Sequence, residues 1–165
     1  MASKINRETR FVTEAAVTAG LYAALTLVSS LFGLSSGAVQ VRLSEALCIL
    51  PIFTPAAIPG LAAGCLIGNL ITGCTVFDVI FGTLATLIGA VGTRLLRNHS
   101  ILACLPPITA NALIIPPVLI NAYHIPKASW LVFLTVAAGE ILSCGVLGTI
   151  LGKALKKNRE FKNRI

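Results

Sequence analysis

The chain alternates six long apolar stretches with short segments that are polar or rich in glycine and proline. A helix needs about 20 apolar residues to cross a bilayer, and a helix satisfies its own backbone polar groups there. The pattern therefore predicts an all-α integral membrane protein that forms a single transmembrane domain over residues 1–165. The six predicted transmembrane helices cover residues 11–32, 38–53, 59–72, 78–96, 101–120 and 130–151.

Composition supports a membrane protein and argues against a soluble domain. Hydrophobic residues make up 56% of the chain and charged residues only 12%, whereas soluble domains carry about 25% charged residues. The lysines and arginines lie in the tails 1–10 and 153–165 and around residues 94–97, apart from Arg42 and Lys127. Because positively charged loops stay in the cytoplasm, we expect both termini to be cytoplasmic. The net positive charge then reflects topology, and no nucleic-acid binding is expected.

Polar side chains recur in the outer half of this predicted bundle, while its inner half has almost none. Ionisable side chains at bilayer depth cost about 2.5–3.5 kcal/mol on insertion scales and usually face a cavity or the bundle interior. The pattern therefore predicts a cup that is open to the outside and binds a polar ligand. The candidate substrate-binding residues are Gln40, Arg42, Glu45, Asn69, Asp78, Asn111 and Glu140.

Structural alternatives remain open for most of these residues. Arg42 and Glu45 are three residues apart and could pair with each other on one helical turn. Asp78 follows a turn and could be a helix-start carboxylate that accepts from free N–H groups. The asparagines could form interhelical hydrogen bonds, and Gln40 could be an ordinary loop residue. Glu140 is hardest to explain in this way, because its neighbours are small or apolar and include no cation.

The first predicted helix carries two neighbouring stripes of small residues. Ala15, Ala19 and Ala23 form the first stripe. The second stripe is Ala16, Gly20 and Ala24. Small residues at four-residue spacing let another helix approach closely, so the stripes predict either packing within the bundle or a face on which a partner protein docks.

Catalytic and metal-binding patterns are missing from the sequence. It contains no HExxH or GxSxG motif. The segment GTILGK at residues 148–153 differs from a phosphate-binding loop, because three residues instead of four separate its glycines. The five cysteines are dispersed through apolar segments and are interpreted as small buried hydrophobes. We therefore expect the chain not to be an enzyme and to bind no metal or cofactor itself.

Three segments carry a resemblance to a known family: VRLSEALCILPIFTPAAIPGLAAGCLIGNL, DVIFGTLATLIGAVGTRLLR and LPPITANALIIPP. With them the chain resembles, over about residues 15–152, the QueT-like queuosine-precursor substrate-binding subunits (S components) of bacterial energy-coupling factor (ECF) transporters. The resemblance implies a six-helix S component in the bacterial plasma membrane that captures queuine or its aminomethyl or nitrile deazaguanine precursors. It also implies a membrane-embedded coupling (T) protein and two cytoplasmic ATPases, which use the ATP, as partners. Docking on the coupling protein would use Ala15, Ala19 and Ala23.

A deazaguanine would suit the predicted cup. Its N–H and NH₂ groups could donate together to one carboxylate, either Glu140 or Glu45. Amide contacts would come from Asn111 or Asn69. Asp78 is the candidate partner for the ammonium group of the aminomethyl form.

Three further roles complete this interpretation. Arg42 is expected to orient Glu45 more than to touch a cationic ligand. Aromatic stacking could come from Phe32, Tyr123 or Trp130. Residues 33–41 are rich in glycine and serine and are a candidate lid over the cup.

The main alternative is a stand-alone secondary transporter of a small nucleobase-like or vitamin-like solute, in which Glu140 or Asp78 carries protons. A membrane enzyme acting on lipids would need a metal-binding carboxylate cluster near the inner face. Glu14 alone does not supply such a cluster. A purely structural protein would not explain the polar cup.

Overall fold

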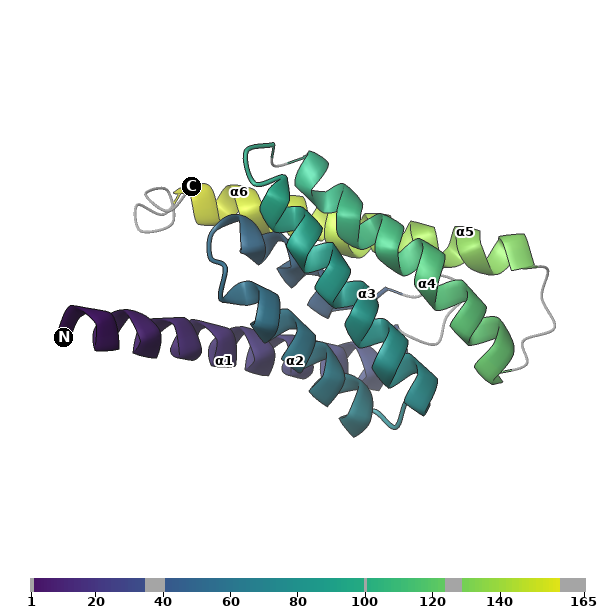
Figure 1. Cartoon of the computed structure of the whole chain (residues 1–165). Helices are drawn as coiled ribbons and strands as arrows, with labels where there is room; N and C mark the ends of the chain where they lie inside the picture. The colour runs from purple at the N-terminus through teal and green to yellow at the C-terminus, as the bar shows by residue number, and fades with distance from the viewer. Residues whose placement is uncertain (1, 35–40, 100, 124–128, 158–165) are drawn as a thin grey trace.

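The computed structural model describes residues 2–34, 41–99, 101–123 and 129–157, and all regular elements in these ranges are helical (Figure 1). The α-helices are α1 (Ala2–Leu31), α2 (Ala57–Ile71), α3 (Val76–Leu95), α4 (Leu105–Tyr123), α5 (Ser129–Glu140) and α6 (Thr149–Lys157). The 3₁₀ helices are η1 (Leu43–Ile52) and η2 (Leu102–Cys104), and the π-helix η3 (Ile141–Gly148) joins α5 to α6. The predicted all-α class is confirmed for the described residues.

Four helical segments are long and apolar enough to cross a membrane. They are Ile5–Leu31, Val76–Leu95, Leu102–Ile120 and Trp130–Lys157. Each overlaps one predicted span. The other two predicted spans correspond to η1 and α2, which are roughly 20 Å and 22 Å long and thus shorter than the hydrocarbon core of about 30 Å. The count of six spans and the cytoplasmic side of the termini stay predictions.

The 3₁₀ helix η1 lies inside the bundle, where it packs against α1, α3 and η3. Both of its ends are fastened to neighbouring helices. At its start, the backbone N–H of Leu43 donates to Ser29 Oγ of α1 at 2.9 Å. At its end, Arg94 Nη1 donates to the carbonyl oxygens of Pro51 and Ile52, each at 3.0 Å. Because the last carbonyls of a helix lack partners within it, Arg94 caps η1 from α3.

Glycines on α2 allow very close packing of α1 and α2. A Cβ atom added to Gly60 would lie 2.6 Å from the carbonyl oxygen of Ala15. At Gly64 it would lie 2.6 Å from Tyr22 Cβ and 2.8 Å from the carbonyl oxygen of Ala19. Side chains larger than hydrogen cannot fit without movement of α1 or α2. The structure therefore places Ala15 and Ala19 in a contact inside the bundle.

The second stripe of small residues on α1 faces outward. Ala16, Gly20 and Ala24 are exposed, whereas Ala23 of the first stripe is buried. A Cβ atom added to Gly20 would have no described atom within 4 Å beyond its own helix backbone and chain neighbours. The face of α1 that remains open to a partner is thus the second stripe.

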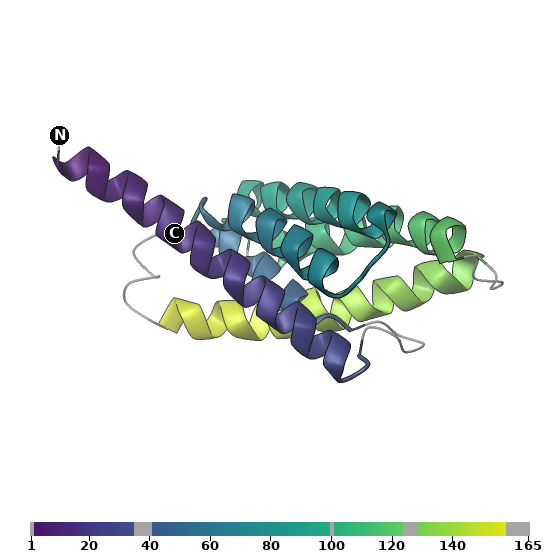
Figure 2. The same ribbon diagram turned by 90° about the horizontal axis from the view of Figure 1, so that it is seen from below.

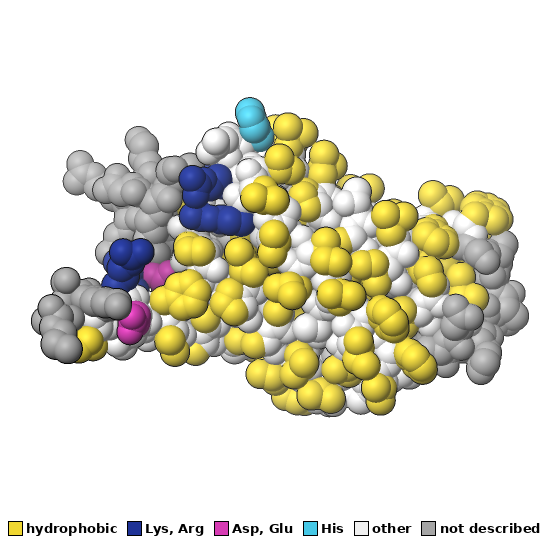
Figure 3. All heavy atoms as spheres, viewed as in Figure 1, with side chains coloured by type: hydrophobic (Ala, Val, Ile, Leu, Met, Phe, Trp, Pro, Cys, Tyr) yellow, Lys and Arg dark blue, Asp and Glu magenta, His cyan; other side chains and the backbone are white. Residues whose placement is uncertain are grey.

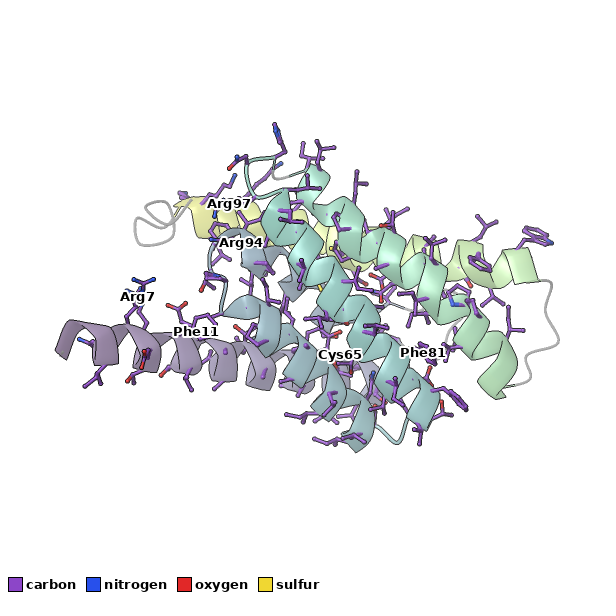
Figure 4. The ribbon with its side chains drawn as sticks, in the orientation of Figure 1. Arg7, Phe11, Cys65, Phe81, Arg94 and Arg97 are labelled. Carbon is purple, nitrogen blue, oxygen red and sulfur yellow. The ribbon has the colours of Figure 1, made fainter. Side chains whose placement is uncertain are left out.

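Apolar side chains cover most of the face that Figure 3 shows, and the charged side chains visible on it gather at one end. The start of α1 extends beyond the bundle at this charged end, and the end of α6 lies there too (Figures 1 and 2). An apolar surface along the helices with a basic end is the pattern of a multi-pass membrane protein. We call this end the basic end: Arg7, Arg94 and Arg97 lie there (Figure 4), and Arg10 lines the same recess as Arg7 and Arg94.

Candidate functional site

A small buried cavity lies where η1, α3, α4 and α5 meet. It is lined by Arg42, Glu45, Gly82, Thr86, Asn111, Ile115, Val136 and Glu140. Its free volume of about 20 Å³ is room for about one water molecule, whereas ligand pockets typically measure about 300–1,000 Å³. The structure thus brings four predicted binding residues together in one small cavity: Arg42, Glu45, Asn111 and Glu140.

Two donors from the bundle interior hold Glu45, whose residue surface is only 2% exposed. The hydroxyl of Tyr22 donates to Oε1, and Cys48 Sγ donates to Oε2 at 3.0 Å. A buried carboxylate is costly unless it is hydrogen-bonded, so these donors stabilise Glu45 in one orientation. Tyr22 is itself buried where α1 meets Gly64. The contact between α1 and α2 therefore positions a carboxylate of the cavity.

Asn111 and Glu140 bring unused polar atoms to the same cavity. They are 4% and 8% exposed. Among the described residues, neither Asn111 Nδ2 nor Glu140 Oε2 has a hydrogen-bond partner. Nearly all buried polar groups are paired, and an unpaired one costs about 1–3 kcal/mol. The Asn111 amide lies beside the Glu140 carboxylate, and the missing well-formed hydrogen bonds leave both groups able to bond to a polar molecule in the cavity.

Arg42 lines the cavity from the residue that precedes η1. Its side chain is half-buried, and its backbone N–H donates to Ser143 Oγ of η3 at 3.2 Å. Within the ranges that the structure describes, no ion pair joins Arg42 to Glu45. The donors on Glu45 are Tyr22 and Cys48 instead, which leaves the guanidinium for the cavity.

Asn69 and Asp78 lie together at the turn between α2 and α3, and neither lines the cavity. Asn69 Nδ2 donates to the backbone carbonyl of Asp78 at 3.3 Å. Thr75 Oγ1 donates to Asp78 Oδ2 at 3.0 Å and accepts from the Asp78 backbone N–H at 3.3 Å. Asp78 therefore lies in the first turn of α3 and bonds to Thr75 there, which agrees with the alternative interpretation of Asp78 as a helix-start carboxylate. Asn69 lies next to Gly82, a residue that does line the cavity, because a Cβ atom added to Gly82 would lie 3.0 Å from Asn69 Nδ2.

The remaining candidates do not reach the cavity or cannot be placed. Gln40 and residues 35–40 of the candidate lid lie outside the described residues, as does the side chain of Tyr123. Phe32 and Trp130, considered for stacking, are largely exposed and do not line the cavity. Within the described ranges, His, Cys, Asp and Glu side chains form no group of three or more that could hold a metal ion.

Sequence reasoning missed Tyr22 as the donor to Glu45, and Gly82 and Thr86 as lining residues. Residues 78, 82 and 86 recur every fourth position, so they share one face of α3. Because Asp78 is a candidate for the bundle interior, this spacing could have placed Gly82 and Thr86 there as well. The sequence around Tyr22 gives no comparable signal, because the spacing of the small residues there predicts only helix packing.

We expect Tyr22→Phe to destabilise the protein by about 1–3 kcal/mol, because Glu45 Oε1 loses a buried donor. Thermal unfolding of the purified protein in detergent measures this loss. Thr109→Val is the control, because the exposed hydroxyl of Thr109 bonds only to carbonyls of its own helix. An unchanged melting temperature for Tyr22→Phe would show that Glu45 does not depend on this donor.

The fold and the cavity define the class of protein: a multi-pass helical membrane protein that encloses two carboxylates, an amide and a guanidinium in a small internal cavity. The chain matches the QueT transporter family over residues 12–157 and belongs to that family. The resemblance of its three sequence segments to the QueT family is thus confirmed. The family consists of transporters and not of enzymes.

A curated relative is the queuosine precursor transporter QueT of Lactococcus lactis subsp. cremoris (strain MG1363), which is 38% identical over 73 residues. The match covers 44% of this chain and 43% of the relative, so it spans less than half the length of that protein. No solved structure matches the chain.

Proposed function

We propose that the chain is the substrate-binding S component of an ECF-type ATP-driven importer and that it captures a queuosine precursor from outside the cell. Membership of the QueT transporter family and the name of the Lactococcus relative support the substrate class. The single observation that carries the proposal is the small cavity in which Asn111 and Glu140 meet, with Asn111 Nδ2 and Glu140 Oε2 lacking a well-formed hydrogen bond within the described part of the chain. Those atoms match a ligand that both donates and accepts hydrogen bonds.

The chemistry of a deazaguanine allows a specific assignment in this cavity. Its adjacent N–H and NH₂ groups donate to the carboxylate of Glu140 as a bidentate pair. Its ring carbonyl accepts from Asn111 Nδ2 or from Arg42. Glu45, already held by Tyr22, balances the charge of Arg42 or of an aminomethyl ligand. Asp78 has no role in this assignment, because it does not line the cavity.

Ligand entry requires the cavity to widen, since about 20 Å³ is far below the volume of typical ligand pockets. The π-helix η3 begins directly after Glu140, and π-helical segments frequently occur at functional sites. In the proposal, α5 and η3 move away from η1 to admit the base. The lid role of residues 33–41 belongs to the same proposal and would fail if ligand left their protease accessibility unchanged.

The transport cycle in this proposal needs partner subunits. The protein would have six spans with both termini cytoplasmic. A membrane-embedded coupling protein would bind α1, and two cytoplasmic ATPases would hydrolyse the ATP. The exposed stripe of Ala16, Gly20 and Ala24 is the part of α1 that suits such docking in this conformation, while Ala15 and Ala19 would need α2 to move first.

Thermal unfolding of the purified protein with a panel of ligands tests the substrate class. The panel contains queuine, the aminomethyl and nitrile deazaguanines, guanine, riboflavin and biotin. A ligand that binds only the folded state stabilises it by about 2.7 kcal/mol at a hundredfold excess over Kd, so we expect a clear rise in melting temperature with one deazaguanine alone. No rise with any deazaguanine would remove the substrate proposal. Uptake that needs a proton gradient and no ATPase would favour a secondary transporter instead.

A further inference from the structure

A second, larger recess lies at the basic end, far from the polar cavity along the helices. It has a volume of about 940 Å³ and is open to the surroundings. Its walls come from the first turns of α1, from the turn after η1 and from the end of α3. The residues that matter here are Arg7, Arg10, Arg94, Phe11, Phe53 and Pro55. We call this recess the basic groove.

The charges of the basic groove favour an anion. Of its two carboxylates, Glu14 is already engaged, because Arg10 Nε donates to Glu14 Oε1 at 3.0 Å and Thr54 Oγ1 donates to Oε2 at 2.6 Å. The other is the exposed Glu8. Against these acids stand Arg7, Arg10 and Arg94. The groove therefore carries a net positive charge.

Two of these arginines retain N–H groups for a ligand. Arg94 Nη1 donates to two carbonyl oxygens of η1, and these bonds fix the position of the guanidinium. Of the five N–H donors of an arginine side chain, those on Nε and Nη2 then remain for a ligand. Arg7 makes no hydrogen bond or ion pair within the described part of the chain. Figure 4 shows Arg7 rising from α1 on the side where Arg94 and Arg97 lie. Guanidinium groups bind phosphate with paired hydrogen bonds.

The groove also crosses the boundary between polar and apolar surface. Arg94 is in the last turn of α3, one of the apolar helices long enough to span a membrane. On α1, the exposed Phe11 and Val12 follow Arg7 and Arg10 and also line the groove. A ligand that fills it must therefore place an anionic group against the arginines and a hydrocarbon chain against Phe11 and Val12. Basic pockets between membrane helices are known sites for anionic lipid headgroups.

We propose that the basic groove binds an anionic glycerophospholipid, with its phosphate on Arg7 and Arg94 and an acyl chain along Phe11 and Val12. The lipid would join α1 to α3 and to the turn after η1 at the membrane surface. This site is separate from the polar cavity, so the lipid proposal does not depend on which solute the protein carries.

The test uses the full chain purified in detergent, with native mass spectrometry to count bound lipid and thermal unfolding to measure stabilisation. Phosphatidylglycerol, phosphatidylcholine and inorganic phosphate are compared. We expect phosphatidylglycerol to bind and stabilise more than the other two. Arg7→Gln should weaken phosphatidylglycerol binding about fivefold, the typical share of one basic residue near an anionic surface. Lys153→Gln, which removes an exposed lysine of α6 outside the groove, should leave binding unchanged.

Glu8→Gln is a second test variant, and it is expected to bind phosphatidylglycerol more tightly than the original protein. It removes the exposed carboxylate from the groove and should tighten phosphatidylglycerol binding without disturbing Arg94, which the fold needs as a cap on η1. Equal losses in Arg7→Gln and Lys153→Gln would overturn the proposal, because general attraction to the basic end would then explain binding. Equal stabilisation by inorganic phosphate would assign the site to a free anion, and equal binding of phosphatidylcholine would exclude a role for charge. Either result would reject the lipid site.

Discussion

Glu140→Gln is expected to weaken binding of the deazaguanine that we propose as the ligand by about thirtyfold or more, because removing one partner of a buried, charge-assisted hydrogen bond costs about 2–5 kcal/mol. The amide of glutamine keeps the shape of the side chain but has only one acceptor oxygen and no charge. It cannot accept both donors of a deazaguanine edge. Isothermal titration calorimetry, or the thermal shift at several ligand concentrations, measures the loss.

The stability of the ligand-free protein separates this effect from misfolding. Glu140 is 8% exposed, and its Oε2 has no partner in the described part of the chain. A neutral side chain at this position avoids the cost of burying a charge, so Glu140→Gln should be as stable as the original protein without ligand, or more stable. Lower affinity without lower stability is therefore the expected combination.

Asp78→Asn is the matched comparison, since it neutralises a buried carboxylate that lies outside the cavity. It should lower stability, because Thr75 donates to Asp78 at the start of α3, and it should leave affinity nearly unchanged. If Asp78→Asn reduced affinity as strongly as Glu140→Gln, the ligand would lie closer to the turn between α2 and α3 than the cavity indicates.

Gly64→Ala is expected to destabilise the protein by about 1–3 kcal/mol or more, the usual cost of forcing extra atoms into a packed contact. The new methyl group would lie 2.6 Å from Tyr22 Cβ and 2.8 Å from the carbonyl oxygen of Ala19. Neither atom is the end of a flexible side chain, so α1 and α2 must separate. Because Tyr22 also holds Glu45, ligand affinity should fall together with the melting temperature.

Gly20→Ala on the outer face of α1 is the control for this substitution. Its added Cβ meets no described atom within 4 Å outside its own helix backbone and chain neighbours, and alanine favours a helix over glycine by about 1 kcal/mol. We therefore expect an unchanged or slightly higher melting temperature. A Gly64→Ala protein as stable as Gly20→Ala would contradict the close packing of α1 on α2.

The sequence was sufficient to predict the helical class, the family and four residues of the cavity. Arg42, Glu45, Asn111 and Glu140 were found because charged and amide side chains within apolar segments are rare and because their depths agree. Depth along a helix axis says nothing about direction around it. Asn69 and Asp78 have a suitable depth, but Asn69 donates to the Asp78 backbone and Asp78 accepts from Thr75 at the turn between α2 and α3.

The direction of a residue around the helix axis also determines which of the two stripes of α1 faces α2. Adjacent residues on a helix point about 100° apart, so Ala15 and Ala16 cannot both face α2. Only the glycines of α2 show which stripe is inside, through contacts that depend on tertiary packing. The 3₁₀ form of η1 could not be predicted from the sequence either, because its apolar run has the pattern of an ordinary short transmembrane helix. The hydrogen bonds from Leu43 to Ser29 and from Arg94 to the end of η1 are tertiary contacts.

The π-helix η3 changes the helical phase between the two halves of the last long helix. Each residue inserted relative to a regular α-helix rotates everything beyond it by about 100° around the axis. Glu140, just before η3, and Lys153, beyond it in α6, therefore point in directions around the axis that a regular α-helix would not give them. A regular α-helix over the same residues could not direct Glu140 into the cavity and keep α6 in its present orientation at the same time.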